Sequence, residues 1–353
     1  MELAHQLGAD ARLPTMKELS ASLQVSVMTL NRALSELEAQ GVIYRKQGSG
    51  TYVAPGIGQR NIGLVYDRDI FSAGASPFCS MLVEEARKRA VSGREKFSFY
   101  LAMPSQQGHP VHDDLVDALR GRRLNGVLFV GESNPEALHW LLEQEIPVVA
   151  LAYTPIAPWR VKIDHAEGVR LGAEALIAQG CRRLGLWIPI GNGIGRQPGH
   201  ASFPELDAFQ GTLKKHKLPF HPELVWRNDE LTDSVPAQAT ETEQEQGIRA
   251  ATEVFGTNGA PTLPDGIVID DDTMTRGALI ALGRLGIQPG VDIKIASHTN
   301  RGSTVLQGYE DNLTLFEIDP SELVRAMYEM LETLIQGGTP SVATINVKPR
   351  LRA

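Results

Sequence analysis

Two short stretches of this chain carry side chains whose types and spacing suit contact with a nucleic acid. One is the region 26–35, where polar and apolar side chains lie between leucines at helical spacing, and the other is the basic, glycine-containing run 45–48. Lys and Arg neutralise phosphates, whereas Asn, Arg and apolar side chains contact base edges. The candidate contact residues are Lys17, Val27, Met28, Thr29, Asn31, Arg32, Arg45, Lys46, Gln47 and Gly48.

A second polar group lies at the junction between a predicted strand and a predicted helix. Asp270, Asp271 and Asp272 follow the apolar run GIVI and precede TMTRGALIAL. Carboxylates at such a junction accept hydrogen bonds from the first turn of the helix, so at least one of the three is expected to be an N-cap. A carboxylate also accepts hydrogen bonds from the hydroxyl groups of a ligand. Chelation of a cation is the weaker alternative.

Two helices joined by a tight turn would position the first group. Thr15 and Glu18 have the spacing of a capping box, which predicts a helix over residues 16–23. Ser26 is a second N-cap candidate, and the following leucines recur at i, i+4 and i+7. A helix-turn-helix is therefore predicted, with its second helix ending near Gly41.

The residues after Gly41 predict a β-hairpin, or wing. Two β-rich runs, 42–44 and 51–53, flank the segment 45–50, which contains two basic residues and two glycines. We expect that segment to form the tip of the hairpin.

Taken in order, the motifs between Leu13 and Val53 resemble the GntR family of winged helix-turn-helix regulators. They are LPT-x-x-ELS-x-x-L-x-VS, then T-L-x-x-AL-x-x-L-x-x-x-G-x-I, then QGSGTYV. The resemblance implies binding to an operator in double-stranded DNA. Val27 and Asn31 stand where the family commonly has arginine, so other residues of the second helix are expected to contribute to base contacts. The family's first helix is longer than the segment before Leu13, so Met1 is not assumed to be the native start. A helical hairpin for protein contact is the alternative.

Charge is distributed unevenly along the 353 residues. The net charge is −8, yet residues 1–55 contain five basic and five acidic side chains, so the whole acidic surplus lies beyond them. Because phosphate neutralisation supplies most nonspecific DNA affinity, a neutral head predicts modest binding by one copy. We therefore expect a homodimer that binds an inverted repeat.

Composition excludes several other classes. Cys79 and Cys181 lie far apart without a CxxC partner, which argues against a disulfide framework or a metal site. No charged leader and no run of about eighteen apolar residues occurs, so we expect a cytoplasmic protein without membrane contact. The few lysines beyond residue 60 lie in no pyridoxal context, and prolines after the glycine-rich run 191–195 disfavour a dinucleotide site. We expect neither an enzyme nor a cofactor.

Beyond a Pro/Gly-rich linker at 55–60, apolar runs alternate with amphipathic segments. Alternation of this kind predicts parallel sheets covered by helices on both faces, with a ligand site at the carboxyl ends of the strands. The strands are too many for one small sheet, so two lobes are expected. The predicted strands are 61–66, 97–102, 125–130, 147–152, 183–189, 223–227, 265–270, 292–297, 312–318 and 342–347. The predicted helices are 78–93, 111–121, 134–144, 164–180, 205–216, 244–255, 272–285 and 321–336.

This region resembles the sensor domain of the LacI family and of periplasmic sugar-binding proteins. The shared stretches are SPF at 76–78, D-x-x-x-G from Asp164, PDGIVIDDDTMTRGALIAL and DIKIAS. The resemblance implies two Rossmann-like lobes of the periplasmic binding protein type I fold, here behind a small winged helix-turn-helix domain, as in the arabinose-repressor type of regulator. The expected domains are 1–54, a linker at 55–60, and 61–353, with chain crossings near 153–156, 298–302 and 318–320.

The same resemblance implies a set of effector-binding residues. Phe78 stands where an aromatic ring stacks on the ligand, and Asp271 stands where a polar side chain binds ligand hydroxyls. Glu205 replaces an arginine that anchors many ligands, which favours a hydroxyl-rich or cationic effector, since carboxylates only accept. Thr299 replaces an aspartate of the family. The full set is Ser76, Phe78, Glu205, Asp271, His298 and Thr299.

These observations lead to one functional hypothesis. We expect a ligand-responsive DNA-binding regulator, a repressor released from its operator by a sugar or related metabolite. A corepressed regulator and a ligand-independent DNA-binding protein are the alternatives.

Overall fold

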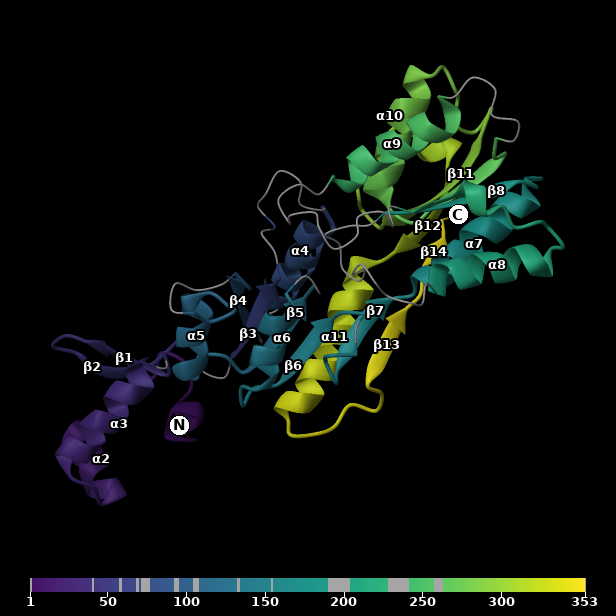
Figure 1. Cartoon of the computed structure of the whole chain (residues 1–353). Helices are drawn as coiled ribbons and strands as arrows, with labels where there is room; N and C mark the ends of the chain where they lie inside the picture. The colour runs from purple at the N-terminus through teal and green to yellow at the C-terminus, as the bar shows by residue number, and fades with distance from the viewer. Residues whose placement is uncertain are drawn as a thin grey trace.

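A computed structural model describes residues 2–39, 41–56, 59–67, 70, 77–91, 95–103, 108–131, 134–153, 155–189, 204–227, 241–256 and 263–352. Within these ranges the chain forms three units: a small N-terminal head, an N-terminal lobe and a C-terminal lobe (Figure 1). The head lies beside the N-terminal lobe, at the end remote from the C-terminal lobe. None of the helices in these ranges is long and apolar enough to span a lipid bilayer.

The head contains the predicted helix-turn-helix. Its elements are α1 (Glu2–Leu7), α2 (Met16–Leu23), α3 (Val27–Ala39), β1 (Ile43–Lys46) and β2 (Gly50–Val53). Thr15 and Glu18 form the predicted capping box, in which the Glu18 N–H donates to Thr15 Oγ1 at 3.3 Å and the Thr15 N–H donates to Glu18 Oε2 at 2.8 Å. An apolar core holds the head together, made by Leu13, Leu19, Leu30, Leu34, Val42, Ile43 and Val53 with Ala4.

The wing differs from its predicted form. Residues 45 and 46 belong to strand β1, which pairs antiparallel with β2 in the register Arg45↔Thr51 and Lys46↔Gly50. The turn therefore contains only three residues, and the Ser49 N–H donates to the Lys46 carbonyl at 2.9 Å. Gly48 has φ +72°, a conformation that glycine adopts without strain. Placing Arg45 and Lys46 at the tip was wrong, because cross-strand pairing extends the hairpin by two residues.

The N-terminal lobe is a parallel sheet in the order β13-β7-β6-β5-β3-β4. Its elements are β3 (Arg60–Tyr66), α4 (Pro77–Val91), β4 (Glu95–Leu101), α5 (Asp113–Arg120), β5 (Gly126–Val130), α6 (Pro135–Leu142), β6 (Val148–Leu151), β7 (Arg160–Ile163), α11 (Pro320–Ile335) and β13 (Thr344–Val347). One face packs against α4 and α11, and the other against α5 and α6. Strand β7 was not predicted, since its sequence RVKI is short and half polar.

The C-terminal lobe is a second sheet in the order β14-β12-β11-β10-β8-β9, parallel except for the edge strand β14. Its elements are α7 (His165–Ala178), β8 (Leu184–Ile188), α8 (Pro204–Lys215), a 3-10 turn (Pro222–Leu224), β9 (Val225–Arg227), α9 (Glu243–Phe255), β10 (Gly266–Ile269), α10 (Asp272–Arg284), β11 (Lys294–Asn300), a 3-10 turn (Glu310–Asn312), β12 (Thr314–Ile318) and β14 (Arg350–Leu351). Helices α9 and α10 cover one face and α7 and α8 cover the other. The predicted two-lobed α/β fold is confirmed.

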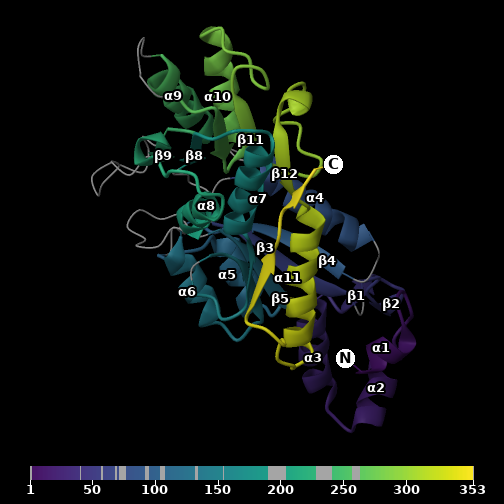
Figure 2. The same cartoon turned by 90° about the vertical axis from the view of Figure 1, so that its right-hand side faces the viewer.

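Of the three predicted crossings between the sheets, the one near 318–320 is confirmed and the other two lie elsewhere. Residues 153–156 join β6 to β7 within one sheet, and residues 298–302 lead from β11 to β12 within the other, so neither is a crossing. The chain crosses after Ile163, after Ile318 and after Val347, and Figure 2 shows the chain that follows α11 running up to its end in the C-terminal lobe. Missing strand β7 placed the first crossing too early in the chain, and missing strand β14 left the last crossing unpredicted.

Candidate DNA-reading head and effector cleft

Helix α3 exposes one face at its N-terminal end. Ser26 caps the helix, its Oγ accepting the Thr29 N–H at 3.1 Å. The leucines 30 and 34 are buried, whereas Val27 and Met28 are 55% and 84% exposed. Such exposure is unfavourable for apolar side chains unless a partner covers them, and the C5-methyl group of thymine is an apolar contact in the major groove. The predicted reading residues therefore lie at the end of α3 that would enter the groove.

Arg45 lies between the wing and α3. Its Nη2 donates to Asn31 Oδ1 at 3.1 Å and to Ser35 Oγ at 3.1 Å, and its Nε lies 3.2 Å from Glu38 Oε2. Arg45, a predicted DNA contact, thus binds side chains of α3, whereas the next residue, Lys46, is exposed and projects from the wing. Sequence reasoning missed this contact because residues 31 and 45 belong to different elements. The remaining candidates, all exposed, are Lys17 in the first turn of α2, Arg32 on α3, and Gln47 and Gly48 in the wing turn.

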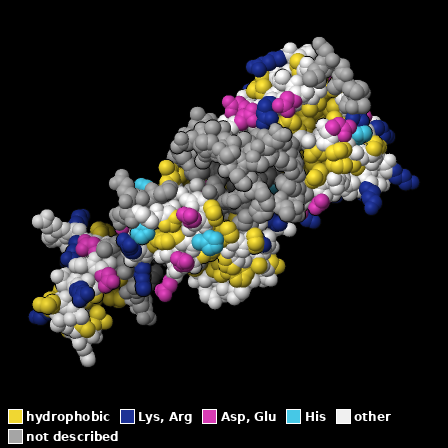
Figure 3. Space-filling view, viewed as in Figure 1, with side chains coloured by type: hydrophobic (Ala, Val, Ile, Leu, Met, Phe, Trp, Pro, Cys, Tyr) yellow, Lys and Arg dark blue, Asp and Glu magenta, His cyan; other side chains and the backbone are white. Residues whose placement is uncertain are grey.

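Basic and acidic side chains are interspersed on the face of the head shown in Figure 3. This agrees with the equal numbers of basic and acidic residues in positions 1–55. The ion pair between Arg45 and Glu38 further reduces the positive charge available to phosphates.

The carboxyl edges of the two sheets meet at a polar network. Tyr153 follows β6 of the N-terminal lobe, and its hydroxyl lies 2.8 Å from His165 Nε2 at the start of α7. His165 Nδ1 lies 3.1 Å from Asp270 Oδ1, at the end of β10. The His165 ring also lies 5.8 Å from the His298 ring, which lies 6.0 Å from Phe316. The site thus joins three segments far apart in the sequence.

Asp271 and Asp272 lie at the N-terminus of α10. Asp271 is the N-cap, as one of the three aspartates was expected to be, and its Oδ1 accepts the Met274 N–H at 2.6 Å. Asp272 Oδ2 accepts from Ser303 Oγ at 3.0 Å and from Thr299 Oγ1 at 3.5 Å. Burial raises the pKa of Asp271 well above its ordinary value, and the neighbouring Asp272 charge adds to this. Burial also raises the pKa of Asp272, although the Ser303 hydrogen bond opposes it.

Asp67 forms part of the N-terminal lobe's edge. It is buried at the end of β3, and its N–H donates to the Val130 carbonyl at 3.1 Å. A Cβ at Gly131 would lie 2.0 Å from Asp67 Cγ, and Gly131 has φ +124°. Glycine is therefore required at this position for the carboxylate to lie where it does.

The other predicted effector residues are dispersed. His298 and Thr299 are buried at the end of β11, beside the network around Asp270 and Asp272. Phe78 is packed in the apolar core of the N-terminal lobe, and Glu205 is buried in the first turn of α8. Ser76 and the glycine run 191–195 lie outside the described residues.

Tyr153 and His165 were not predicted as site residues, nor was a ligand contact assigned to Asp270. Each follows a strand or begins a helix at the carboxyl edge of a sheet. Ligands of open α/β sheets bind at these edges, so considering the residues after every predicted strand would have found them. Among the residues described, no group of three or more His, Cys, Asp or Glu side chains could hold a metal ion.

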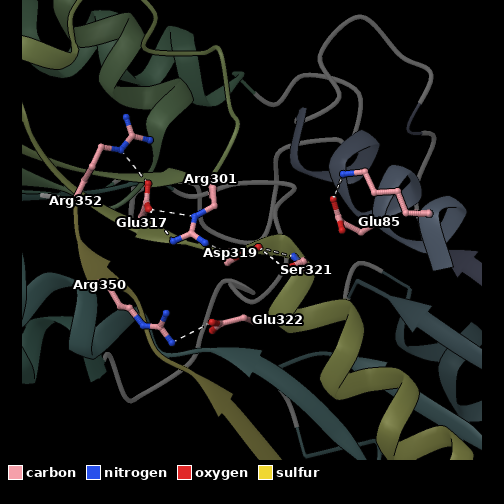
Figure 4. Close-up of polar contacts among 9 residues, drawn as sticks. Glu85, Arg301, Glu317, Asp319, Ser321, Glu322, Arg350 and Arg352 are labelled. Carbon is pink, nitrogen blue, oxygen red and sulfur yellow. Dashed lines mark hydrogen bonds and ion pairs between the residues drawn. The ribbon is translucent and has the colours of Figure 1, made fainter.

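A groove of about 620 Å³ lies between α4, the turn at Arg301 and the start of α11. Figure 4 shows the ion pairs around it: Arg301 Nη1 lies 2.7 Å from Asp319 Oδ2, and Arg350 Nη2 lies 3.0 Å from Glu322 Oε1. The second pair joins β14 of the C-terminal lobe to α11, which packs on the N-terminal lobe. This pair therefore links the two lobes next to the crossing that follows Val347.

Comparison with known proteins agrees with the two-part organisation. The model of the periplasmic binding protein-like domain matches residues 173–353, just over half of the chain. The chain belongs to this family. The model of bacterial regulatory proteins of the gntR family matches residues 3–53, which span the head. The predicted GntR-type head on a LacI-like sensor is confirmed.

Individual relatives match most or nearly all of this periplasmic binding protein-like chain. The arabinose metabolism transcriptional repressor of Geobacillus stearothermophilus is 23% identical over 99% of this chain and 92% of that protein. A regulatory protein of the LacI family from Chloroflexus aggregans superposes with a TM-score of 0.63 at 20% identity, over 82% of this chain and 96% of that one. The complex of the transcriptional regulator CelR with cellobiose gives a TM-score of 0.63 at 20% identity, over 97% and 99% of the two chains.

Proposed function

We propose that this protein is a transcriptional repressor that binds operator DNA as a homodimer and is released when a small hydroxyl-rich molecule binds between its lobes. The observation that carries the proposal is the joining of a gntR-type head to a two-lobed sensor whose sheet edges meet at a buried polar network. As a regulator of transcription it would act in the cytoplasm.

The chemistry of the polar network between the lobes supports a neutral polyol or sugar as effector. Asp270, Asp272, Thr299 and Asn300 are buried together at the carboxyl edge of the C-terminal lobe. Carboxylates accept hydrogen bonds from hydroxyl groups and repel anions, while Thr and Asn supply both donors and acceptors. A sugar fits this set, and the relatives that act in arabinose metabolism or bind cellobiose agree with it.

The charge of the head supports a dimer on an inverted repeat. The head exposes few uncompensated cations, so one copy would make too few phosphate contacts for tight binding. Two heads on half-sites double those contacts, and a two-fold symmetric dimer matches a palindromic operator.

Effector and DNA are coupled through the positions of the lobes. The head adjoins the N-terminal lobe, whereas the network of Asp270 and His165 joins that lobe to the C-terminal one. An effector shifts the open–closed equilibrium by its difference in affinity for the two forms. A typical coupling of about 1–3 kcal/mol would change operator affinity roughly 5–150-fold.

A thermal-shift panel of sugars, polyols and nucleosides on the full-length protein tests the proposal. We expect a sugar or polyol to raise the unfolding temperature and then to weaken binding to a DNA site selected by the protein. Tighter DNA binding with the same ligand would indicate a corepressor. A protein that binds DNA but is stabilised by no member of the panel would contradict the proposed effector class.

A further inference from the structure

We infer that Met28, together with the neighbouring Val27, recognises thymine in the operator by apolar contact with its C5-methyl group. The inference rests on the proposed binding of operator DNA by the head. Met28 is 84% exposed, and no other large apolar side chain in the part of the chain that the structure describes is exposed to this extent. Its position on α3 and the chemistry around it lead to thymine as its partner.

Exposed apolar side chains occur together at the turn between α2 and α3. Leu23, Val25, Val27 and Met28 are all exposed, within six residues of the chain. Single exposed apolar residues are common on protein surfaces, whereas a group of them marks a contact surface. Val27 and Met28 begin α3, the second helix of the helix-turn-helix, and the N-terminal residues of this helix contact base edges in the major groove.

The helical spacing directs Met28 away from the core of the head. Leu30 and Leu34 are buried in that core, and Met28 lies about 200° around the helix from Leu30. Arg32, which is also exposed, follows Met28 at i+4 and therefore lies on the same face of α3. Because arginine binds phosphates and base edges, this face of the helix is suited to DNA at both positions.

The first turn of α3 offers little hydrogen bonding for base recognition. Ser26 Oγ accepts the Thr29 N–H at 3.1 Å, and the Ser26 and Thr29 hydroxyl oxygens lie 2.9 Å apart, so these two hydroxyl groups bind each other. The side chain of Val27 has no polar atom, and Met28 has only a weakly accepting sulfur. The pair therefore lacks the donors and acceptors with which Asn, Gln or Arg distinguish bases.

Thymine is the base whose major-groove edge carries an apolar group, the C5-methyl. The other three bases present hydrogen-bond donors and acceptors there, and an apolar side chain would remove these from water without replacing their hydrogen bonds. Contact with Met28 is therefore favourable at a thymine and unfavourable at the other bases. Burial of one methyl group should strengthen binding about fourfold.

Removal of single methyl groups from the DNA tests the inference. A duplex selected from random DNA by the full-length protein supplies the site, and each thymine is replaced in turn by deoxyuridine, which lacks only the methyl group. We expect at least one thymine in each half-site at which this change weakens binding by the wild type about two- to fivefold. At the same position 5-methylcytosine should be bound more tightly than cytosine, because it carries the methyl group on a different base.

Protein variants assign the methyl contact to its side chain. Met28→Ala removes an exposed side chain, so the fold of the head should persist and the loss caused by deoxyuridine should disappear. Val27→Ala should reduce that loss, and Met28→Leu, which keeps a large apolar side chain, should retain it. The matched control is Lys46→Ala, which should weaken binding to the thymine and deoxyuridine duplexes equally. Equilibrium titrations of each variant with each duplex give these differences as a double-mutant cycle.

Three results would overturn the inference while leaving the proposed function intact. They are a selected site with no thymine sensitive to loss of its methyl group, a loss in Met28→Ala as large as in the wild type, and binding by Met28→Ala that equals the wild type on every duplex. The last result would mean that the exposed apolar group serves a contact other than DNA. A wild-type protein that enriches no DNA motif would overturn the proposed function together with this inference.

Discussion

Replacing Asp271 with asparagine should stabilise the C-terminal lobe at neutral pH, although the change removes a charge from a helix N-terminus. Burial and the nearby Asp272 carboxylate raise the pKa of Asp271 well above its ordinary value. The net environment therefore disfavours the charged form, even with the Met274 N–H donating to it. Asparagine caps a helix about as well as aspartate, so the variant loses the charge and keeps the cap.

The expected pH dependence has a definite sign. A carboxyl whose folded pKa is raised contributes stability below its unfolded pKa of about 3.9 and loses that contribution as pH rises through the folded value. The Asp271→Asn variant should therefore match the wild type in acid and exceed it increasingly toward neutral pH.

Asp271→Ala separates the cap from the charge. Alanine also lacks the charge, so the two variants differ mainly by the hydrogen bond to the Met274 N–H, which is 2.6 Å long in the wild type. A lost N-cap costs about 0.5–2 kcal/mol, with roughly 2–4 °C of unfolding temperature per kcal/mol for a unit of this size. The alanine variant should thus have a lower free energy of unfolding than the asparagine variant at every pH.

Urea unfolding between pH 4 and pH 8, followed by tryptophan fluorescence, measures these differences. Trp187 and Trp226 lie in the core of the C-terminal lobe and report on it. The reasoning is refuted if the asparagine variant is as unstable as the alanine variant at pH 7, or if its difference from the wild type does not change with pH.

Three further outcomes follow from the packing and the site. Gly277→Ala should lower the free energy of unfolding of the C-terminal lobe by at least about 1–3 kcal/mol, because the new Cβ would lie 1.9 Å from the Gln244 carbonyl oxygen of α9. The control is Gly283→Ala on the same helix, whose Cβ would meet nothing within 4 Å. In the same urea titration this variant should be as stable as the wild type or more stable. Tyr153→Phe should cost about 0.5–1.5 kcal/mol by removing the 2.8 Å contact with His165, and no change in unfolding midpoint would show that the contact does not persist in solution. Lys46→Ala should lower the slope of log affinity against log salt by about 1, and an unaltered slope would mean that this exposed lysine does not bind phosphate.

Local features of the sequence specified most of the secondary structure. The capping box of Thr15 and Glu18 involves residues three apart, and the helix it predicted has the bounds observed. The alternation of apolar strands and helices similarly predicted two parallel sheets, since buried parallel strands are apolar on both faces. The strands that were missed, β7 and β14, are four and two residues long and partly exposed, so their pairing depends on neighbours already in place.

The residues of the candidate sites were only partly predictable. The three aspartates at 270–272 were found from their place between a strand and a helix. Their separate contacts were not predicted: Asp271 caps α10, whereas the Asp270 carboxylate contacts the His165 ring, which is distant in the sequence. Phe78 was expected at the ligand and lies in the lobe core.

The sequence by itself therefore determined the class of this protein, a winged helix-turn-helix head on a two-lobed α/β sensor, because capping, helical periodicity and strand alternation act over a few residues. The tertiary structure decided where the chain crosses between lobes, which side chains meet where the two sheets adjoin, and that Arg45 lies against Asn31. These depend on strand pairing and on contacts between residues distant in the chain, whose geometry no local pattern contains.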